Sequence, residues 1–127
     1  MSEVPRQVDR QQRGRAGEDA AVAVLQRAGY TVLERNVRCG RVELDIVARD
    51  ATGLAFVEVK ARWSDVYGRP EEAITPTKRH NLIRAALWYL RERDLDGQPW
   101  RIDVLALRLS GSRLLSYELF RDAVEDE

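Results

Sequence analysis

The sequence has one cysteine, no long apolar run and almost no lysine. A single thiol, Cys39, cannot form a disulfide within the chain or supply the several thiolates of a zinc site. The longest purely apolar run, Ala20 to Leu25, has six residues, far below the ~20 needed to span a bilayer. The first residues are polar and arginine-rich, unlike a secretory signal. These absences predict a reduced, cytoplasmic protein without a membrane segment.

The charges cancel in number but are unevenly distributed. The 21 basic and 21 acidic residues give a formal net charge of zero, yet 19 of the bases are arginines and only Lys60 and Lys78 are lysines. Four of the acids lie within the last six residues, so the rest of the chain carries 21 bases against 17 acids. A mildly basic body of this kind permits a polyanionic partner such as nucleic acid.

Hydrophobic patterning predicts an α/β fold with the order helix, three strands, helix, two strands. The second helix begins at Thr75-Pro76, a typical N-cap followed by proline at the first helical position. The predicted apolar face of this helix comprises Leu82, Ile83, Ala86, Leu87 and Leu90. Helices are expected at about residues 16–28 and 75–93, and strands at about residues 30–37, 41–49, 54–61, 100–109 and 113–119.

One domain is expected from this length and pattern. We assign residues 1–13 to a flexible N-terminal arm because they show no sustained apolar period. The domain itself covers residues 14–120, and residues 121–127 form an acidic tail. Within the domain, residues 63–74 contain glycine and proline and are expected to form a loop.

A predicted hairpin at residues 41–61 carries the informative acids. On its first strand, Glu43 and Asp45 are expected to project from one face. The apolar residues of the opposite face are Val42, Leu44 and Ile46. On its second strand, Glu58 and Lys60 share a face. A turn at residues 50–53 can bring Asp45 close to Glu58, although the sequence does not fix the register.

Two carboxylates brought together in this way repel each other. Charges about 5 Å apart cost roughly 3 kcal/mol at an effective dielectric near 20. The ammonium of Lys60 or a divalent cation would offset that cost, and Mg²⁺ prefers carboxylate, carbonyl and water ligands. A metal ion beside an amine can stabilise the charge and orient the water needed to hydrolyse a phosphodiester. Arginine would replace Lys60 poorly because its guanidinium stays protonated.

The pattern of Asp45 followed by Glu58-Val59-Lys60 resembles the PD-(D/E)XK nuclease superfamily, the fold of restriction enzymes and archaeal Holliday-junction resolvases. A longer ordered set of residues resembles the YraN family, small bacterial proteins assigned to that fold. This set extends over about residues 14–120 and comprises Gly17-Glu18, Arg35-Asn36, residues 43–50, residues 56–62, Gly68, Pro70, Glu72-Ala73, Lys78 and residues 101–104. The chain departs from the family at Val42, where glycine is usual, and at Ala61, where a small hydroxyl residue is common.

The resemblance implies a restriction-endonuclease-like mixed sheet of about five strands flanked by helices. It also implies a metal-dependent endonuclease acting on DNA, with branched or processed structures among its substrates. Asp45 and Glu58 would bind Mg²⁺ or Mn²⁺, with the Val59 carbonyl completing the site. Lys60 would orient or activate water, and Glu18 on the first helix would assist. Nucleases of this fold often pair, so a homodimer is one expectation.

Other residues near the hairpin are candidates for contact with nucleic acid. Lys78, Arg62 and Arg79 flank the proposed site and are candidates for phosphate binding. Trp63 is a candidate for stacking on an unpaired base, with core packing as the favoured alternative.

Each of these assignments has a simpler alternative. Lys78, Arg62 and Arg79 could be solvated surface residues. Asp45, Glu58 and Lys60 could be an exposed charged strand face, and Glu18 could be an acid stabilised by the helix dipole. For the whole protein, the alternative function is a nucleic-acid-binding module that keeps the nuclease fold without turnover. A double-stranded-RNA-binding domain shares the first five elements, but it explains the hairpin acids poorly.

Overall fold

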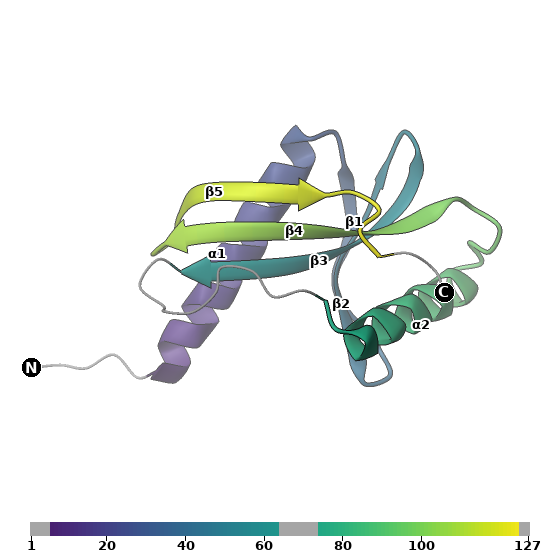
Figure 1. Cartoon of the computed structure of the whole chain (residues 1–127), viewed down its shortest axis with the longest axis horizontal. Coiled ribbons are helices and arrows are strands. Elements are labelled where there is room, and N and C mark those ends of the chain that lie inside the picture. The colour runs from purple at the N-terminus through teal and green to yellow at the C-terminus, as the bar shows by residue number, and fades with distance from the viewer. Residues whose placement is uncertain (1–5, 64–73, 125–127) are drawn as a thin grey trace, which may run out of the picture.

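Two helices and five strands follow one another in the predicted order, in a computed structural model that describes residues 6–63 and 74–124, with side chains from residue 14 onward (Figure 1). The elements are α1 (Arg6–Arg27), β1 (Thr31–Cys39), β2 (Val42–Asp50), β3 (Gly53–Trp63), α2 (Pro76–Glu92), β4 (Trp100–Ser110) and β5 (Arg113–Phe120). The predicted α/β class is confirmed. Most of the segment predicted as a loop, residues 64–73, lies outside the described residues.

The five strands form one mixed sheet in chain order, β1-β2-β3-β4-β5. β1, β2 and β3 pair antiparallel, β3 and β4 pair parallel, and β5 returns antiparallel to β4. A parallel pair needs a long crossover connection, and α2 lies within it between β3 and β4.

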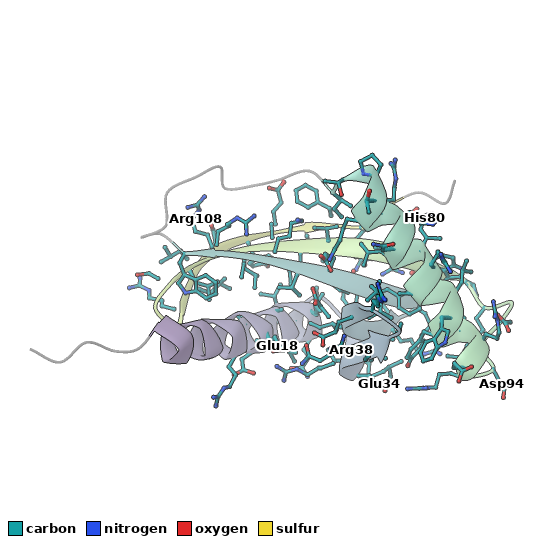
Figure 2. All side chains as sticks on the ribbon, turned by 90° about the horizontal axis from the view of Figure 1, so that it is seen from below. Glu18, Glu34, Arg38, His80, Asp94 and Arg108 are labelled. Atoms are coloured by element: carbon teal, nitrogen blue, oxygen red, sulfur yellow. The ribbon has the colours of Figure 1, made fainter. Side chains whose placement is uncertain are left out.

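The helices pack on opposite faces of the sheet (Figures 1 and 2). On the α1 side, Leu25 packs with Ile46 in one buried cluster. On the α2 side, Leu82 packs with Phe56 and Ile102 in a second. Within the described part of the chain, neither helix is long and apolar enough to cross a membrane.

The helices differ from the sequence prediction in two details. α1 begins at Arg6 rather than near Ala16, so residues 6–13, assigned above to the arm, are helical. In α2, Leu87 is 41% exposed, whereas the prediction placed it on the apolar face. The buried stripe includes Ala86, as predicted, and it continues to Tyr89, which the prediction left out. The predicted N-cap is confirmed, because the Thr75 hydroxyl accepts a hydrogen bond from the Lys78 N–H at 3.1 Å.

A buried carboxylate, Asp103, ties the C-terminal residues to the sheet. Its side chain is fully buried and accepts hydrogen bonds from the Tyr30 hydroxyl at 2.6 Å, Arg101 Nε at 3.0 Å and the Asp122 N–H at 2.8 Å. Val124 is also buried and packs in the α2-side cluster. Residues 121–124, assigned above to the tail, therefore pack against the domain.

Replacing Asp103 with alanine is expected to destabilise the protein strongly. The change removes a fully buried carboxylate that accepts hydrogen bonds from three donors, and it should cost about 3 kcal/mol or more of unfolding free energy. Urea denaturation of Asp103→Ala measures this loss. The matched control is Asp96→Ala at an exposed position, expected to stay within about 0.5 kcal/mol of the parent chain. Equal stability of the two variants would contradict the account.

Candidate functional site

The turn between β2 and β3 determines which residues of the hairpin face each other. Gly53 has φ +138°, and a Cβ at this residue would lie 2.6 Å from the Pro99 carbonyl oxygen. Asp50 closes the turn by accepting the Thr52 N–H at 2.9 Å. Asp50 therefore pairs with Gly53, and the ladder runs from there to Ile46 opposite Val57. Only glycine fits this turn, which fixes the register that the sequence alone left open.

β2 and β3 part immediately beyond that last pair. The next residues in the same register are Asp45 and Glu58. At this point the Val59 N–H bonds to a side chain of β2 and not to its backbone. The acceptor is Asp45 Oδ2, at 2.8 Å. The Asp45 carboxylate is thus held across the gap between the strands, next to Glu58.

The alternation of side chains along β2 is interrupted at this gap, so residues on its two sides that were predicted to share a face do not. Leu44 packs in the α2-side cluster, whereas Ile46 packs on the α1 side, so the prediction that they share a face is wrong. The irregularity coincides with Asn36 on β1, which lies between the partners of Leu44 and Ile46 and has φ +54°. Asparagine tolerates this left-handed conformation better than most residues.

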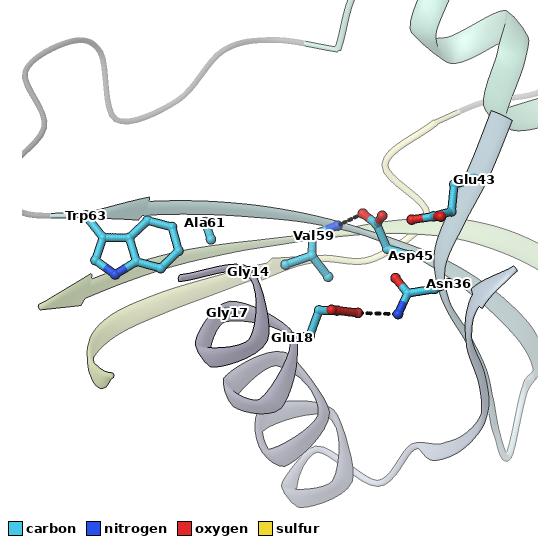
Figure 3. Close-up of a pocket in the computed structure, with 9 residues that line it drawn as sticks. All are labelled: Gly14, Gly17, Glu18, Asn36, Glu43, Asp45, Val59, Ala61 and Trp63. Carbon is cyan, nitrogen blue, oxygen red and sulfur yellow. Dashed lines mark hydrogen bonds between the residues drawn. The ribbon is translucent and has the colours of Figure 1, made fainter. Parts of the chain in front are cut away.

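A pocket of about 500 Å³ opens beside Asp45 on the α1 side (Figure 3). The carboxylates of Glu18 and Glu43 line it together with Asp45, and Val59 forms part of its wall. Glu18 Oε1 accepts a hydrogen bond from Asn36 Nδ2 at 2.5 Å. The structure thus brings Glu18 and Asp45, two of the predicted site residues, to one pocket.

Close packing of α1 on β3 places Glu18 at this pocket. A Cβ on Gly17 would lie 3.3 Å from the Ala61 Cβ, so the helix approaches the strand closely at that point. Trp63 also lines the pocket, and its indole N–H donates to the Gly111 carbonyl at 2.9 Å. The core-packing alternative for Trp63 agrees with its contacts in the α1-side cluster.

Glu58 is a buried carboxylate with a lysine as its counter-charge. Its side chain is 8% exposed, and its Oε2 lies 3.0 Å from Lys78 Nζ. Lys78 stands in the first turn of α2, and its side chain is 43% exposed. A carboxylate withdrawn from water requires such a partner. Lys78, predicted to contact phosphate, therefore neutralises Glu58 in this structure.

The pKa of Asp45 is raised to about 7, because burial disfavours its charged form and the neighbouring Glu58 charge repels it. The hydrogen bond from Val59 acts in the opposite direction but is the smaller effect. Ionisation of both carboxylates near neutral pH is therefore unfavourable, and a bound cation would reduce the repulsion between them.

The remaining predicted residues lie on β3 and α2, the elements that carry Glu58 and Lys78. Lys60 is half-buried and follows Glu58 on the same face of β3, whereas Arg62 donates from Nη1 to the Ala61 carbonyl at 3.3 Å. Arg79 is half-buried in α2, and its Nε has no hydrogen-bond partner among the described residues. Those residues also include no group of three or more histidine, cysteine, aspartate or glutamate side chains placed to hold a metal ion.

Sequence reasoning did not assign two of these interactions. Asn36 matches the family motif in the sequence, which gives it no role, yet its side chain donates to Glu18 and it lies across from Asp45. An asparagine within a run of strand-forming residues is the signal that could have identified it. The pairing of Lys78 with Glu58 left no local signal, because it depends on where α2 lies against the sheet.

Replacing Glu58 with glutamine should lower the pKa of Asp45 from about 7 toward its ordinary value, because the change removes the neighbouring charge. NMR titration of the Asp45 carboxyl carbon with a chelator present measures this shift. Glu43→Gln is the matched control, since Glu43 lines the same pocket but is not among the main causes of the shift. An unchanged Asp45 pKa in Glu58→Gln would show that the two carboxylates are not coupled.

Comparisons with known proteins place the chain in a family. The sequence profile of the uncharacterised protein family UPF0102 matches residues 17–107. A UPF0102 protein of Desulfosudis oleivorans is 47% identical over 116 residues, covering 91% of this chain and 92% of the relative. One of Syntrophus aciditrophicus is 45% identical over 114 residues, covering 88% and 87%.

Among solved structures, one match is the structure of SfsA from Pyrococcus furiosus in complex with Ca²⁺. The TM-score is 0.45 at 17% sequence identity, covering 89% of this chain and 65% of the SfsA chain. Family membership rests on the sequence matches, which extend over most of the domain. This chain belongs to the UPF0102 family, the YraN family whose motifs the sequence carries.

Proposed function

We propose that this protein is a metal-dependent nuclease that hydrolyses phosphodiester bonds in DNA. The observation that carries the proposal is the pair of Asp45 and Glu58, one carboxylate half-buried and the other nearly buried, on neighbouring strands where those strands part. A fold gains no stability from such a pair, because each charge raises the cost of the other. Pairs of this kind are concentrated at sites that bind cations or perform catalysis.

The donor set fits a hard divalent cation such as Mg²⁺ or Mn²⁺. Mg²⁺ commonly takes one or two carboxylates and fills its other positions with water and substrate phosphate. The Val59 carbonyl supplies a further oxygen, because a strand residue directs its N–H and C=O to the same edge and the Val59 N–H binds Asp45. When bound, the ion stabilises charge on the phosphate oxygens and lowers the pKa of a coordinated water.

The protein's own side chains then have distinct roles. Lys60 follows Glu58 on the same face of β3 and can orient the attacking water or take up its proton, which a guanidinium cannot do. Glu18 reaches the same pocket as Asp45 and is held by Asn36, so it can position water on the α1 side. Arg62 and Arg79 supply positive charge near the phosphate backbone.

The second candidate function is nucleic-acid binding without turnover. One observation favours it: Lys78 already neutralises Glu58, so the pair has an internal counter-charge without a metal ion. This candidate predicts salt-sensitive DNA binding, no cleavage and no measurable cation affinity at Asp45 and Glu58.

Cleavage assays with branched, flapped, single-stranded and duplex DNA test the main proposal. Mg²⁺ or Mn²⁺ should support cleavage and a chelator should abolish it. Lys60→Ala should lower the rate at least about 100-fold, because general acid–base groups typically contribute that much. Lys60→Arg keeps the charge and should be impaired nearly as strongly. Cleavage at the parent rate by Lys60→Ala would refute the assignment.

Removing the internal counter-charge should strengthen cation binding. Lys78→Gln leaves Glu58 without its ammonium partner, so Mn²⁺ affinity should rise about tenfold as a repelling charge is lost. Calorimetric titration of the metal-free protein with Mn²⁺ measures this change. Arg91→Gln, at an exposed position in the last turn of α2, is the control and should bind Mn²⁺ as the parent does. Unchanged or weaker binding by Lys78→Gln would show that Lys78 does not compete with a cation at Glu58.

A further inference from the structure

Two arginines lie side by side on the sheet face opposite α1. In the parallel register of β3 and β4, Arg62 is directly across from Arg108, and both are half-buried. Arg108 alternates along β4 with Leu107 and Leu109, which are buried in the α1-side cluster. Its side chain therefore lies on the face opposite α1, as Figure 2 shows. Although α2 packs on the same face, Arg108 is at the other end of the sheet from that helix. Two neighbouring strands therefore each present a guanidinium group, a good donor for phosphate oxygens, on this face of the sheet.

A pocket of about 270 Å³ lies at these arginines. Its lining residues include Arg62, Arg108, Ser116 and Glu118. Ser116 is the β5 partner of Arg108, so its hydroxyl is on the same face of the sheet. Arg108 itself forms no ion pair with any residue that the structure describes. Two guanidinium groups, each a planar fork of donors, and a hydroxyl suit phosphate oxygens.

The charge at this pocket indicates which kind of phosphate it fits. The carboxylate of Glu118 lines the pocket together with Arg62 and Arg108, and it repels a ligand of high negative charge. A phosphodiester carries one negative charge, whereas a terminal phosphate group carries up to two and is repelled more strongly. The pocket therefore favours a position within a nucleic-acid strand over its end.

The pocket is aligned with the proposed catalytic residues. Glu58, Lys60 and Arg62 occupy alternate positions of β3 and share one face. At about 3.3 Å per residue, Lys60 and Arg62 are about 7 Å apart along the strand. A DNA strand with one phosphate at Lys60 would therefore bring a neighbouring phosphate to the two arginines.

We propose that Arg62, Arg108 and Ser116 form a phosphodiester-binding subsite that holds DNA next to the phosphate at Lys60. The subsite deepens the proposed function and rests on it for the identity of the ligand. Arg108 and Ser116 are positioning residues, because they contact a phosphate that does not react. Their contribution is to affinity and alignment, and it does not require a bound metal ion.

DNA binding by the full chain, measured with a chelator present, tests the subsite separately from cleavage. Fluorescently labelled single-stranded and duplex DNA would be titrated over a range of salt concentrations. Arg108→Gln should weaken binding about tenfold and reduce the slope of log K against log salt by about one, because one phosphate contact is lost. Arg108→Lys keeps the charge but not the guanidinium fork, so it should retain the salt slope and lose only part of the affinity.

The control is Arg38→Gln, which removes an exposed arginine from β1 at the opposite edge of the sheet. It should bind DNA as the parent does. Thermal unfolding reports on folding, and Arg108→Gln should unfold at the same or a higher temperature, because it removes one of two neighbouring like charges.

Equal loss of affinity in Arg108→Gln and Arg38→Gln, or no DNA binding by the parent chain, would overturn the subsite. The proposed hydrolysis fails in a different way. DNA binding that depends on Arg108, without cleavage in Mg²⁺ or Mn²⁺, would refute the nuclease and leave the subsite in place. Normal cleavage and binding by Arg108→Gln would refute the subsite alone.

Discussion

The nearly buried carboxylate of Glu58 beside that of Asp45 is the arrangement around which the rest of the site is organised. The β2–β3 turn fixes the register, and the register makes these two acids the first residues beyond the last ladder pair. Each acid then has its own partner, since Val59 donates its N–H to Asp45 and Lys78 provides the counter-charge for Glu58. The electrostatic cost that remains appears in the raised pKa of Asp45.

The rest of the fold holds this unfavourable arrangement in place. Two clusters of buried side chains, one on each face of the sheet, keep β2 and β3 between the helices. Near the β2–β3 turn, Arg101 joins Asp103 to Asp50 through ion pairs of 3.0 Å and 2.8 Å. Functional groups held by a rigid scaffold lose little freedom when a ligand binds, and their unfavourable electrostatics are tolerated because stability comes from elsewhere.

The element order was predictable from the sequence, because apolar periodicity and turn residues mark each strand and helix locally. The sequence predicted that the hairpin can bring Asp45 close to Glu58, but it did not determine the register. The tight turn at Gly53 determines that register in the structure. The change of face between Leu44 and Ile46 was not predictable, since it accompanies a left-handed residue on β1. The partner of Glu58 was not predictable either, because strict alternation along β3 does not reveal where α2 places Lys78.

The most direct test of the account is a crystal structure of the protein grown with Mn²⁺ and measured for anomalous scattering. The account predicts one anomalous peak in the gap between β2 and β3, within coordination distance of the carboxylates of Asp45 and Glu58, with the Lys78 ammonium withdrawn from Glu58. A structure at the same Mn²⁺ concentration with no peak in this gap, and with Lys78 still paired to Glu58, would contradict it.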